Sequence, residues 1–223
     1  MNTPEFVASL MYIAYKDYTG ARLLLNNNEI LQGLTLASSS VEKYMKAYLL
    51  AIGKTPREVH LDRMKELKKQ FGNSNIAVLD PLDKGFLRLL GKAYSYRYLN
   101  KKSEIEYIGC AINQVLAELD FTVNYFEDQI ELYDPMTGKK KQTWYLRAFE
   151  SNYPIVSQNN YLKQNISKKD FMELPTAMFS LRVNPGKKVG DQLILETIIP
   201  EQKFKYNGAI IENLEIRKKG MKP

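Results

Sequence analysis

Residues 91–107, GKAYSYRYLNKKSEIEY, contain the side chains of this 223-residue chain that are best suited to catalysis or ligand binding. They place Arg97 between two tyrosines near the end of an expected helix. A guanidinium holds a carboxylate or a phosphate through two parallel hydrogen bonds. Three roles are therefore open for Arg97: part of a nuclease, part of a binding pocket, or a helix terminus only.

His60 is the only histidine in the sequence, and its imidazole is the group best suited to proton transfer near neutral pH. It would act as a base if the fold brought it to Arg97. A lone histidine at a helix start more often caps that helix, and no Ser, Cys or metal-ligand partner has a suitable spacing. One Cys and one His cannot form a tetrahedral zinc site, so no metal and no cofactor is expected.

Apolar side chains at helical spacing predict a set of helices in the first half of the chain. We expect helices over 4–25, 29–52, 61–71, 83–99 and 103–127. Asn28 is predicted to cap the second of these helices, and Gly53 to end it. Ser103, with Glu106 three residues later, predicts a capping box for the last. Helices of this length with short links normally pack as antiparallel neighbours.

The stretch AYKDYTGARLLL, the segment SSSVEKYMKAYLLAIG, His60 before the third helix and AYSYRYLN together resemble the HEPN domain, the higher-eukaryote and prokaryote nucleotide-binding domain. The resemblance covers about residues 8–128. It implies a helical bundle that dimerises. Many members are metal-independent RNases that act as toxins, in toxin–antitoxin pairs, or in defence. Others pair with a minimal nucleotidyltransferase. A further alternative is therefore that this chain is the partner of such an enzyme.

The RNases of this family carry a histidine four to six residues after the arginine that Arg97 matches. Lys102, Ser103 and Glu104 stand nearest to that position in this chain. Lysine stays charged unless it is desolvated, and serine needs a base of its own. The sequence therefore predicts a protein that does not cleave RNA, with Arg97 and His60 as the catalytic pair of the alternative.

The resemblance also pairs the arginine with a polar residue of the second helix, which here is Glu42. An Arg97–Glu42 contact would orient two helices without chemistry. In the functional alternative, a phosphate-binding groove lies near the dimer seam and is lined by Arg97, Tyr98, Asn100 and Lys46.

The second half of the chain has a different composition. Short runs rich in Val, Ile, Tyr and Phe predict strands in TWYLRAF, YPIVS, AMFSLRV, QLILETII, KFKYN and AIIENLEI. SKKDFMEL (167–174) predicts a short helix capped by Ser167, and NPGKKVGD (184–191) predicts a hairpin turn. The predicted class is α+β: a HEPN-like antiparallel bundle over 1–130, a turn or linker over 131–142, and a small β-rich basic domain over 143–223.

Positive charge is concentrated in that second part. Residues 131–223 carry 16 Lys and Arg against 10 Asp and Glu, a net +6, whereas residues 1–130 carry a net +1. Tyr153 and Tyr161, with Lys163, Lys168 and Lys169, fit a surface that stacks bases and neutralises phosphates. They fit equally an ordinary strand core with solvated lysines. Trp144 is expected to anchor a small core.

The remaining features set the expected context. The N-terminus has no signal-peptide pattern, no run approaches a membrane span, and the single Cys110 is expected to be buried. We therefore expect a cytoplasmic protein without a membrane partner. The leading functional prediction is a homodimeric binding or assembly protein that contacts RNA or a nucleotide.

Overall fold

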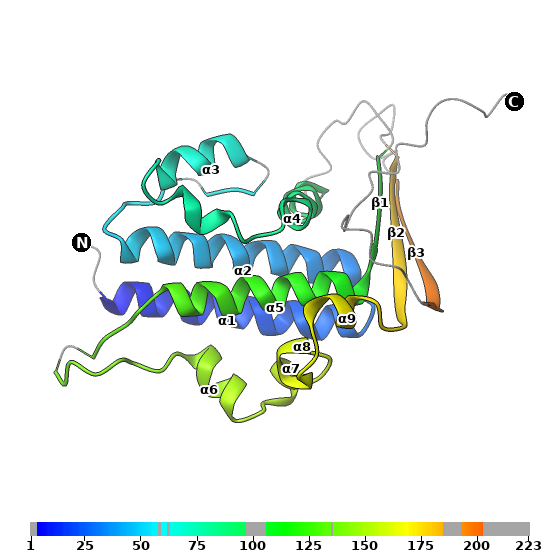
Figure 1. Ribbon diagram of the computed structural model, residues 1–223. Helices are drawn as coiled ribbons and strands as arrows, with labels where there is room; N and C mark the ends of the chain where they lie inside the picture. Colours follow the sequence, from blue (N-terminus) through cyan, green and yellow to red (C-terminus); the bar gives the residue numbers. More distant parts are fainter. Residues whose placement is uncertain are drawn as a thin grey trace, which may run out of the picture.

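The computed structural model describes residues 4–57, 59–61, 63–96, 106–134, 136–184 and 193–202. Two long helices, α1 (Pro4–Asn26) and α2 (Ile30–Ala51), lie side by side at its centre, together with α5 (Ile112–Gln129) (Figure 1). The predicted helices over 4–25 and 29–52 are confirmed. Their regular apolar stripes face the interior, so burial reinforces the helix that the sequence pattern predicts.

The ends of α2 agree with the sequence in one place and differ in another. Asn28 is not the N-cap; it has a φ of 63°, in the left-handed region that asparagine tolerates. Glu29 occupies the N-cap position of α2, without a capping hydrogen bond from its side chain. Gly53 ends the helix as predicted, with a φ of 77°. Its N–H donates to Leu50 O, and the N–H of Lys54 donates to Leu49 O, which is the hydrogen-bond pair of a Schellman motif.

One flank of the central helices carries α3 (Met64–Phe71), the short 3₁₀ helix η1 (Ile76–Leu79) and α4 (Lys84–Tyr96) (Figure 1). Predicted helices over 61–71 and 83–99 correspond to α3 and to α4. The Asp83 carboxylate accepts a hydrogen bond from the N–H of Phe86 at 2.6 Å, so it caps the start of α4. Residues 97–105, including Arg97, lie outside the described residues.

The helix predicted over 103–127 is wrong at its start. Residues Glu106–Ala111 form strand β1, and α5 begins only at Ile112. Strand β1 pairs antiparallel with β2 (Thr176–Asn184), so that Cys110 lies opposite Phe179. This partner is distant in sequence, and its ladder of hydrogen bonds outweighs the helical spacing of the local apolar residues.

The second half is helical before it becomes extended. Strands predicted in TWYLRAF and YPIVS are wrong, because these segments form α6 (Trp144–Glu150) and α7 (Pro154–Ser157). Two further short helices follow, α8 (Tyr161–Gln164) and α9 (Lys168–Met172). The predicted helix after Ser167 is confirmed as α9, and the Ser167 hydroxyl accepts a hydrogen bond from the N–H of Asp170 at 3.0 Å.

A three-stranded sheet in the order β1-β2-β3 stands at one end of the central helices (Figure 1). Strand β3 (Leu193–Gln202) runs antiparallel to β2, with Asn184 opposite Leu193. The strands predicted in AMFSLRV and QLILETII are thus confirmed. The hairpin turn predicted over 184–191 lies, apart from Asn184, outside the described residues. Residues 203–223, with the two remaining predicted strands, lie outside the described residues. The predicted α+β class is confirmed.

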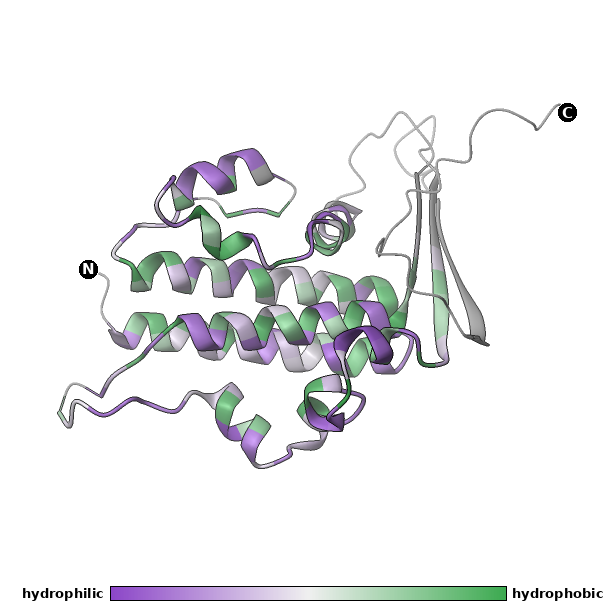
Figure 2. Cartoon of the chain, viewed as in Figure 1, coloured by the Kyte–Doolittle hydropathy of each residue, from purple (hydrophilic) through white to green (hydrophobic). Residues whose placement is uncertain are grey.

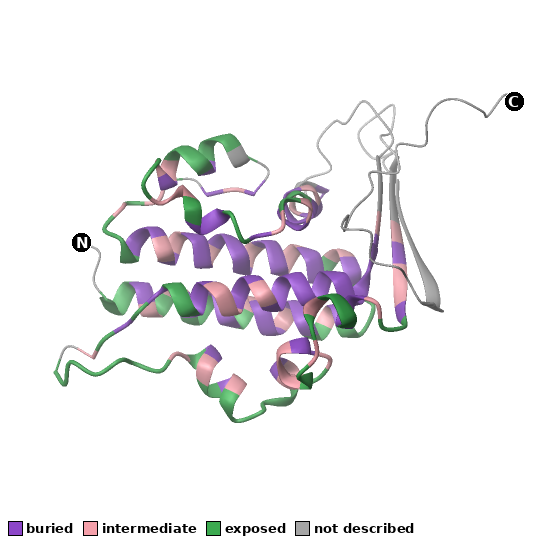
Figure 3. Cartoon of the chain, in the orientation of Figure 1, coloured by how far each residue is buried: buried purple, intermediate pink, exposed green. Residues whose placement is uncertain are grey.

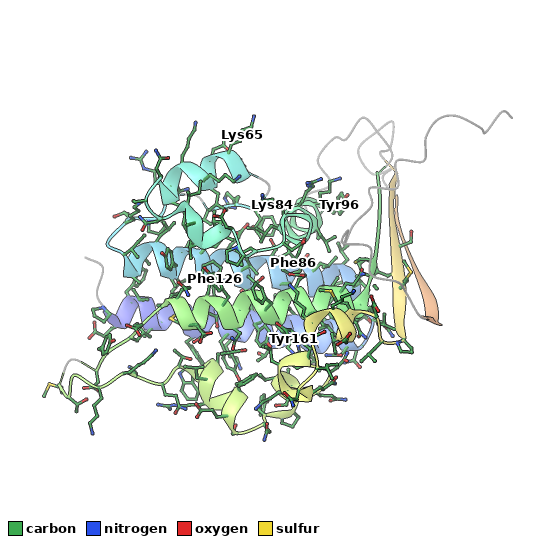
Figure 4. The ribbon with its side chains drawn as sticks, in the orientation of Figure 1. Lys65, Lys84, Phe86, Tyr96, Phe126 and Tyr161 are labelled. Carbon is green, nitrogen blue, oxygen red and sulfur yellow. The ribbon has the colours of Figure 1, made fainter. Side chains whose placement is uncertain are left out.

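The core lies among α1, α2 and α5, where buried positions are most frequent (Figure 3). Hydropathy follows the same division, since α3 is largely hydrophilic on its outer surface (Figure 2). Phe86 of α4 and Phe126 of α5 are buried in this core, whereas Lys65 extends outward from α3 (Figure 4). Among the described residues, no helix has both the length and the apolar character that crossing a membrane requires.

Core side chains on both sides of the predicted boundary at 131–142 belong to one cluster. Within the boundary segment, Tyr133 and Lys140 form an isolated antiparallel bridge. Trp144 is 56 % exposed, so the prediction that it anchors a small core is wrong. Of the two roles left open for Tyr161, burial agrees with the core residue and not with the stacking surface, although Tyr161 lies on a helix and not on a strand. Both outcomes follow from the helices that replace the predicted strands, since these turn different residues toward α1 and α5.

Candidate functional site

The polar residues of α2 and α4 that the sequence singled out are placed only in part. Arg97, Tyr98 and Asn100 lie outside the described residues, so the predicted Arg97–Glu42 contact stays a prediction. Described neighbours of that segment include Tyr96, a buried residue in the last turn of α4 (Figure 4). Helix α4 packs against α2.

Glu42 is a buried carboxylate on α2 that holds the loop between α2 and α3. Its Oε1 accepts a hydrogen bond from the backbone N–H of Leu61 at 3.0 Å. Its Oε2 lies 3.6 Å from Nδ1 of His60, an ion-pair distance if the imidazole is protonated. Because a buried carboxylate needs such donors, this contact accounts for the position of Glu42 without any chemistry.

His60 also lies beside α4, where its ring centroid is 6.4 Å from that of Tyr94. Its side chain is 30 % exposed, so solvent reaches part of the imidazole. The fold thus brings the only histidine of the chain to the last turns of α4. Tyr94, the residue that it approaches there, lies three positions before Arg97 in the sequence. Sequence spacing alone gives no sign of this approach, because it depends on the path of the loop after α2.

The lysines predicted to bind nucleic acid fall into different environments. Lys163 Nζ lies 4.0 Å from the centroid of the Phe149 ring. Lys168 forms an ion pair with Glu118 of α5. Lys169 is exposed on α9, and Lys46 is half-buried on α2. The predicted basic surface is therefore divided, because the Lys163 and Lys168 ammonium groups face partners within the chain.

A buried polar network not anticipated from sequence centres on Arg22, which is fully buried on α1. Its Nη1 donates to both carboxylate oxygens of Asp120 on α5, and the Tyr18 hydroxyl donates to Asp120 Oδ1 at 2.8 Å. Burial raises the pKa of Asp120, and the charge of Arg22 opposes that rise. The sequence did hold a signal of this pair, because Arg22 and Asp120 are opposite charges within the apolar stripes of two predicted helices.

The same guanidinium reaches the segment after α6. Its Nε donates to Ile155 O at 2.7 Å, and Nη2 donates to the carbonyls of Gln158 and Asn159. Arg22 thereby joins α1 to α5 and to the loop between α7 and α8. Its donors are taken up by these acceptors, which makes it a structural residue rather than a ligand-binding one.

Comparison of the chain with protein-family models, with curated proteins and with solved structures found no match. The resemblance to the HEPN domain thus rests on the sequence patterns of residues 8–128 and is carried forward as a proposal. Within the described ranges, no three His, Cys, Asp or Glu side chains come together in a way that would hold a metal ion.

Proposed function

We propose that this chain is a HEPN-like binding or assembly protein that forms a homodimer and contacts RNA or a nucleotide without cleaving it. The observation that supports the binding site is the polar cluster of Glu42, His60 and Tyr94 at the last turns of α4. Arg97 follows directly after that helix in the sequence. A cation there, with Lys46 on α2, would supply the positive groups that a phosphate requires.

Both the role of Glu42 and the residues after Arg97 oppose cleavage. One oxygen of Glu42 is bound by the Leu61 N–H, so the carboxylate holds a loop in place. The family's RNase motif places its histidine shortly after the arginine, where this chain has Lys102, Ser103 and Glu104. The chain thus lacks the proton-transfer group of that motif.

Gel-shift titration with single-stranded RNA and with DNA at two salt concentrations tests the binding. We expect binding at low salt that weakens at high salt, and weaker binding in Lys46→Ala and Arg97→Ala. The matched control is Lys65→Ala, which removes an exposed lysine from α3 (Figure 4). Failure of the wild type to bind at low salt would remove the nucleic-acid part of the proposal. Light scattering on the eluted protein tests the dimer.

A second candidate function is a metal-independent RNase in which His60 is the base. The position of His60 favours it: Nδ1 faces the Glu42 carboxylate, and the ring lies against α4 before Arg97. A carboxylate at one ring nitrogen orients the other for proton transfer. Incubation with RNA in the presence of a chelator, for wild type, Arg97→Ala and His60→Ala, tests it. Equal degradation by all three proteins would exclude this function.

A further inference from the structure

A cavity of about 240 Å³ opens where the start of α1, the end of α5 and the start of α6 meet. It lies across the central helices from α3 and α4, so it is separate from the Glu42–His60 cluster (Figure 1). The residues that matter for its chemistry are Met11, Tyr12, Glu127, Lys141, Trp144 and Arg147. We call it the α1–α6 cavity.

Two exposed aromatic rings form one wall of the α1–α6 cavity. The ring centroids of Tyr12 and Trp144 are 5.5 Å apart, with planes inclined by 52°. Tyr12 is 41 % exposed and Trp144 is 56 % exposed, although large aromatic side chains usually bury most of their surface. Because the two planes are inclined, a planar group can stack on one of these rings at the mouth of the cavity and meet the other ring with its edge.

Positive charge lies at the same mouth. The guanidinium carbon of Arg147 is 5.5 Å from the centroid of the Trp144 ring, one turn further along α6. Lys141 lines the cavity from the segment before α6, and both side chains are exposed. Two cations next to exposed aromatic rings favour a ligand that carries both a planar ring and an anionic group.

Among the described residues that line the α1–α6 cavity, Glu127 is the one acidic residue, and it is buried. Its oxygens accept hydrogen bonds from the hydroxyls of Tyr44 and Thr143, each at 2.6 Å. Burial raises its pKa to about 7, so near neutral pH a large fraction of Glu127 is protonated. Its charge therefore opposes an anionic ligand only weakly, and Lys141 and Arg147 make the net charge of the cavity lining positive.

We propose that the α1–α6 cavity binds a nucleoside phosphate, with the base stacked on Trp144 and its edge against Tyr12, and with the phosphate held by Arg147 and Lys141. The cavity is smaller than most pockets for whole ligands, which hold about 300–1,000 Å³. It therefore encloses one base and leaves the sugar and phosphate at the mouth, where the cations lie. The ligand is a free mononucleotide or an unpaired nucleotide of single-stranded RNA. This inference goes beyond the proposed function, because it concerns a different surface.

Trp144 is the only tryptophan of the chain, so intrinsic tryptophan fluorescence reports on this cavity directly. The probes are AMP, UMP, adenosine, inorganic phosphate and a short single-stranded RNA, with excitation at the red edge of tryptophan absorption. We expect saturable quenching by the nucleotides, by the RNA, or by both. Saturation by mononucleotides identifies a free nucleotide as the source, and saturation by RNA alone identifies the polymer. The proposal is overturned if neither the mononucleotides nor the RNA quench the fluorescence, or if inorganic phosphate and AMP bind with equal affinity.

Variants assign the signal to the cavity. Arg147→Gln and Tyr12→Ala are each expected to weaken binding on the order of tenfold, since base stacking and phosphate contacts are each lost in part. Lys139→Gln is the matched control, because Lys139 is exposed in the same segment without lining the cavity. Arg97→Ala should keep full quenching. Unchanged affinity in both cavity variants with retained helical circular dichroism, or loss of quenching in Arg97→Ala, overturns the proposal.

Discussion

Arg22 of α1 donates hydrogen bonds to both carboxylate oxygens of Asp120 of α5, 98 positions further along the chain. Both side chains are fully buried, and the carbonyls of Ile155, Gln158 and Asn159 accept the remaining guanidinium donors. The pair therefore holds together three segments that are far apart in sequence. Its contribution is better described as a satisfied network than as an isolated ion pair.

Replacing Arg22 with methionine is expected to lower the free energy of unfolding by about 3–5 kcal/mol, because Asp120 is left buried without its cation. Urea denaturation followed by circular dichroism measures this. Arg88→Met is the matched control, since Arg88 is an exposed arginine on α4. If both single variants unfold at the same urea concentration, Arg22 does not have the stabilising role assigned to it.

Gly33 allows α2 to approach the end of α1 closely. A Cβ at this position would lie 2.8 Å from Leu25 Cγ and 3.2 Å from the Leu25 backbone nitrogen. Gly33→Ala gains up to about 1 kcal/mol of helix propensity, yet overpacking typically costs about 1–3 kcal/mol. We expect a net loss of stability, which thermal or urea unfolding will measure.

Gly20 provides the comparison for Gly33. A Cβ at Gly20 would lie 2.9 Å from Leu36 Cδ1, the far end of a flexible side chain. Because Leu36 can rotate away, Gly20→Ala should leave the free energy of unfolding within about 0.5 kcal/mol of wild type or raise it. A larger loss in Gly20→Ala than in Gly33→Ala would contradict this packing of Leu25 and Leu36.

Cys110 is expected to be unreactive in the folded protein. It is 2 % exposed on β1, opposite Phe179 of β2, and burial raises the pKa of its thiol well above the usual value. The thiolate is the reactive form, so both exposure and ionisation oppose reaction. A disulfide reagent that releases a coloured product should react with one thiol in urea and far more slowly in native buffer. Comparable rates would show that β1 opens readily.

The helical centre was predictable from sequence because local and long-range preferences agree there. The stripes of 4–25 and 29–52 have helical spacing, and the NNNE segment between them favours a turn. Burial of the same residues against α5 then reinforces each helix. Gly53 is a similar case, since its φ of 77° suits glycine and its position after α2 follows from the sequence.

Predictions failed where distant partners decide the conformation. TWYLRAF is rich in residues that favour strands, yet Thr143 caps a helix through the Leu146 N–H, and Tyr145 and Ala148 are buried. A cap followed by apolar residues three apart was an available signal. Strand β1 gave no such sign, because its partner β2 lies about 70 positions later.

The candidate sites show the same division. Glu42 was predicted to be a polar residue facing α4, and the structure places it beside His60 at that helix. The α1–α6 cavity was not predicted, because it needs α6 to be a helix that turns Trp144 toward Tyr12. Which face of a short helix is exposed depends on packing that no local pattern specifies.

Glu127 is expected to make stability depend on pH. Burial raises its pKa from 4.5 to about 7 in the folded protein, while Tyr44 and Thr143 oppose that rise through hydrogen bonds. A carboxyl whose folded pKa is raised binds its proton more tightly in the folded state. Its stabilising contribution is therefore complete below pH 4.5, and it is lost as pH rises through about 7. The whole change amounts to about 3 kcal/mol at 1.36 kcal/mol per pKa unit.

Comparison with Glu127→Gln isolates this contribution, because glutamine keeps the shape and an acceptor but does not titrate. Other buried carboxyls, such as Asp120, titrate in both proteins and cancel in the difference. Urea unfolding at several pH values measures the free energy of unfolding of both proteins. Between pH 4.5 and pH 8, that of the variant should rise relative to wild type by up to about 3 kcal/mol. A difference that stays flat across this range, or that moves in the opposite direction, would mean that Glu127 is ionised in the folded protein, in which case the α1–α6 cavity would carry a full negative charge.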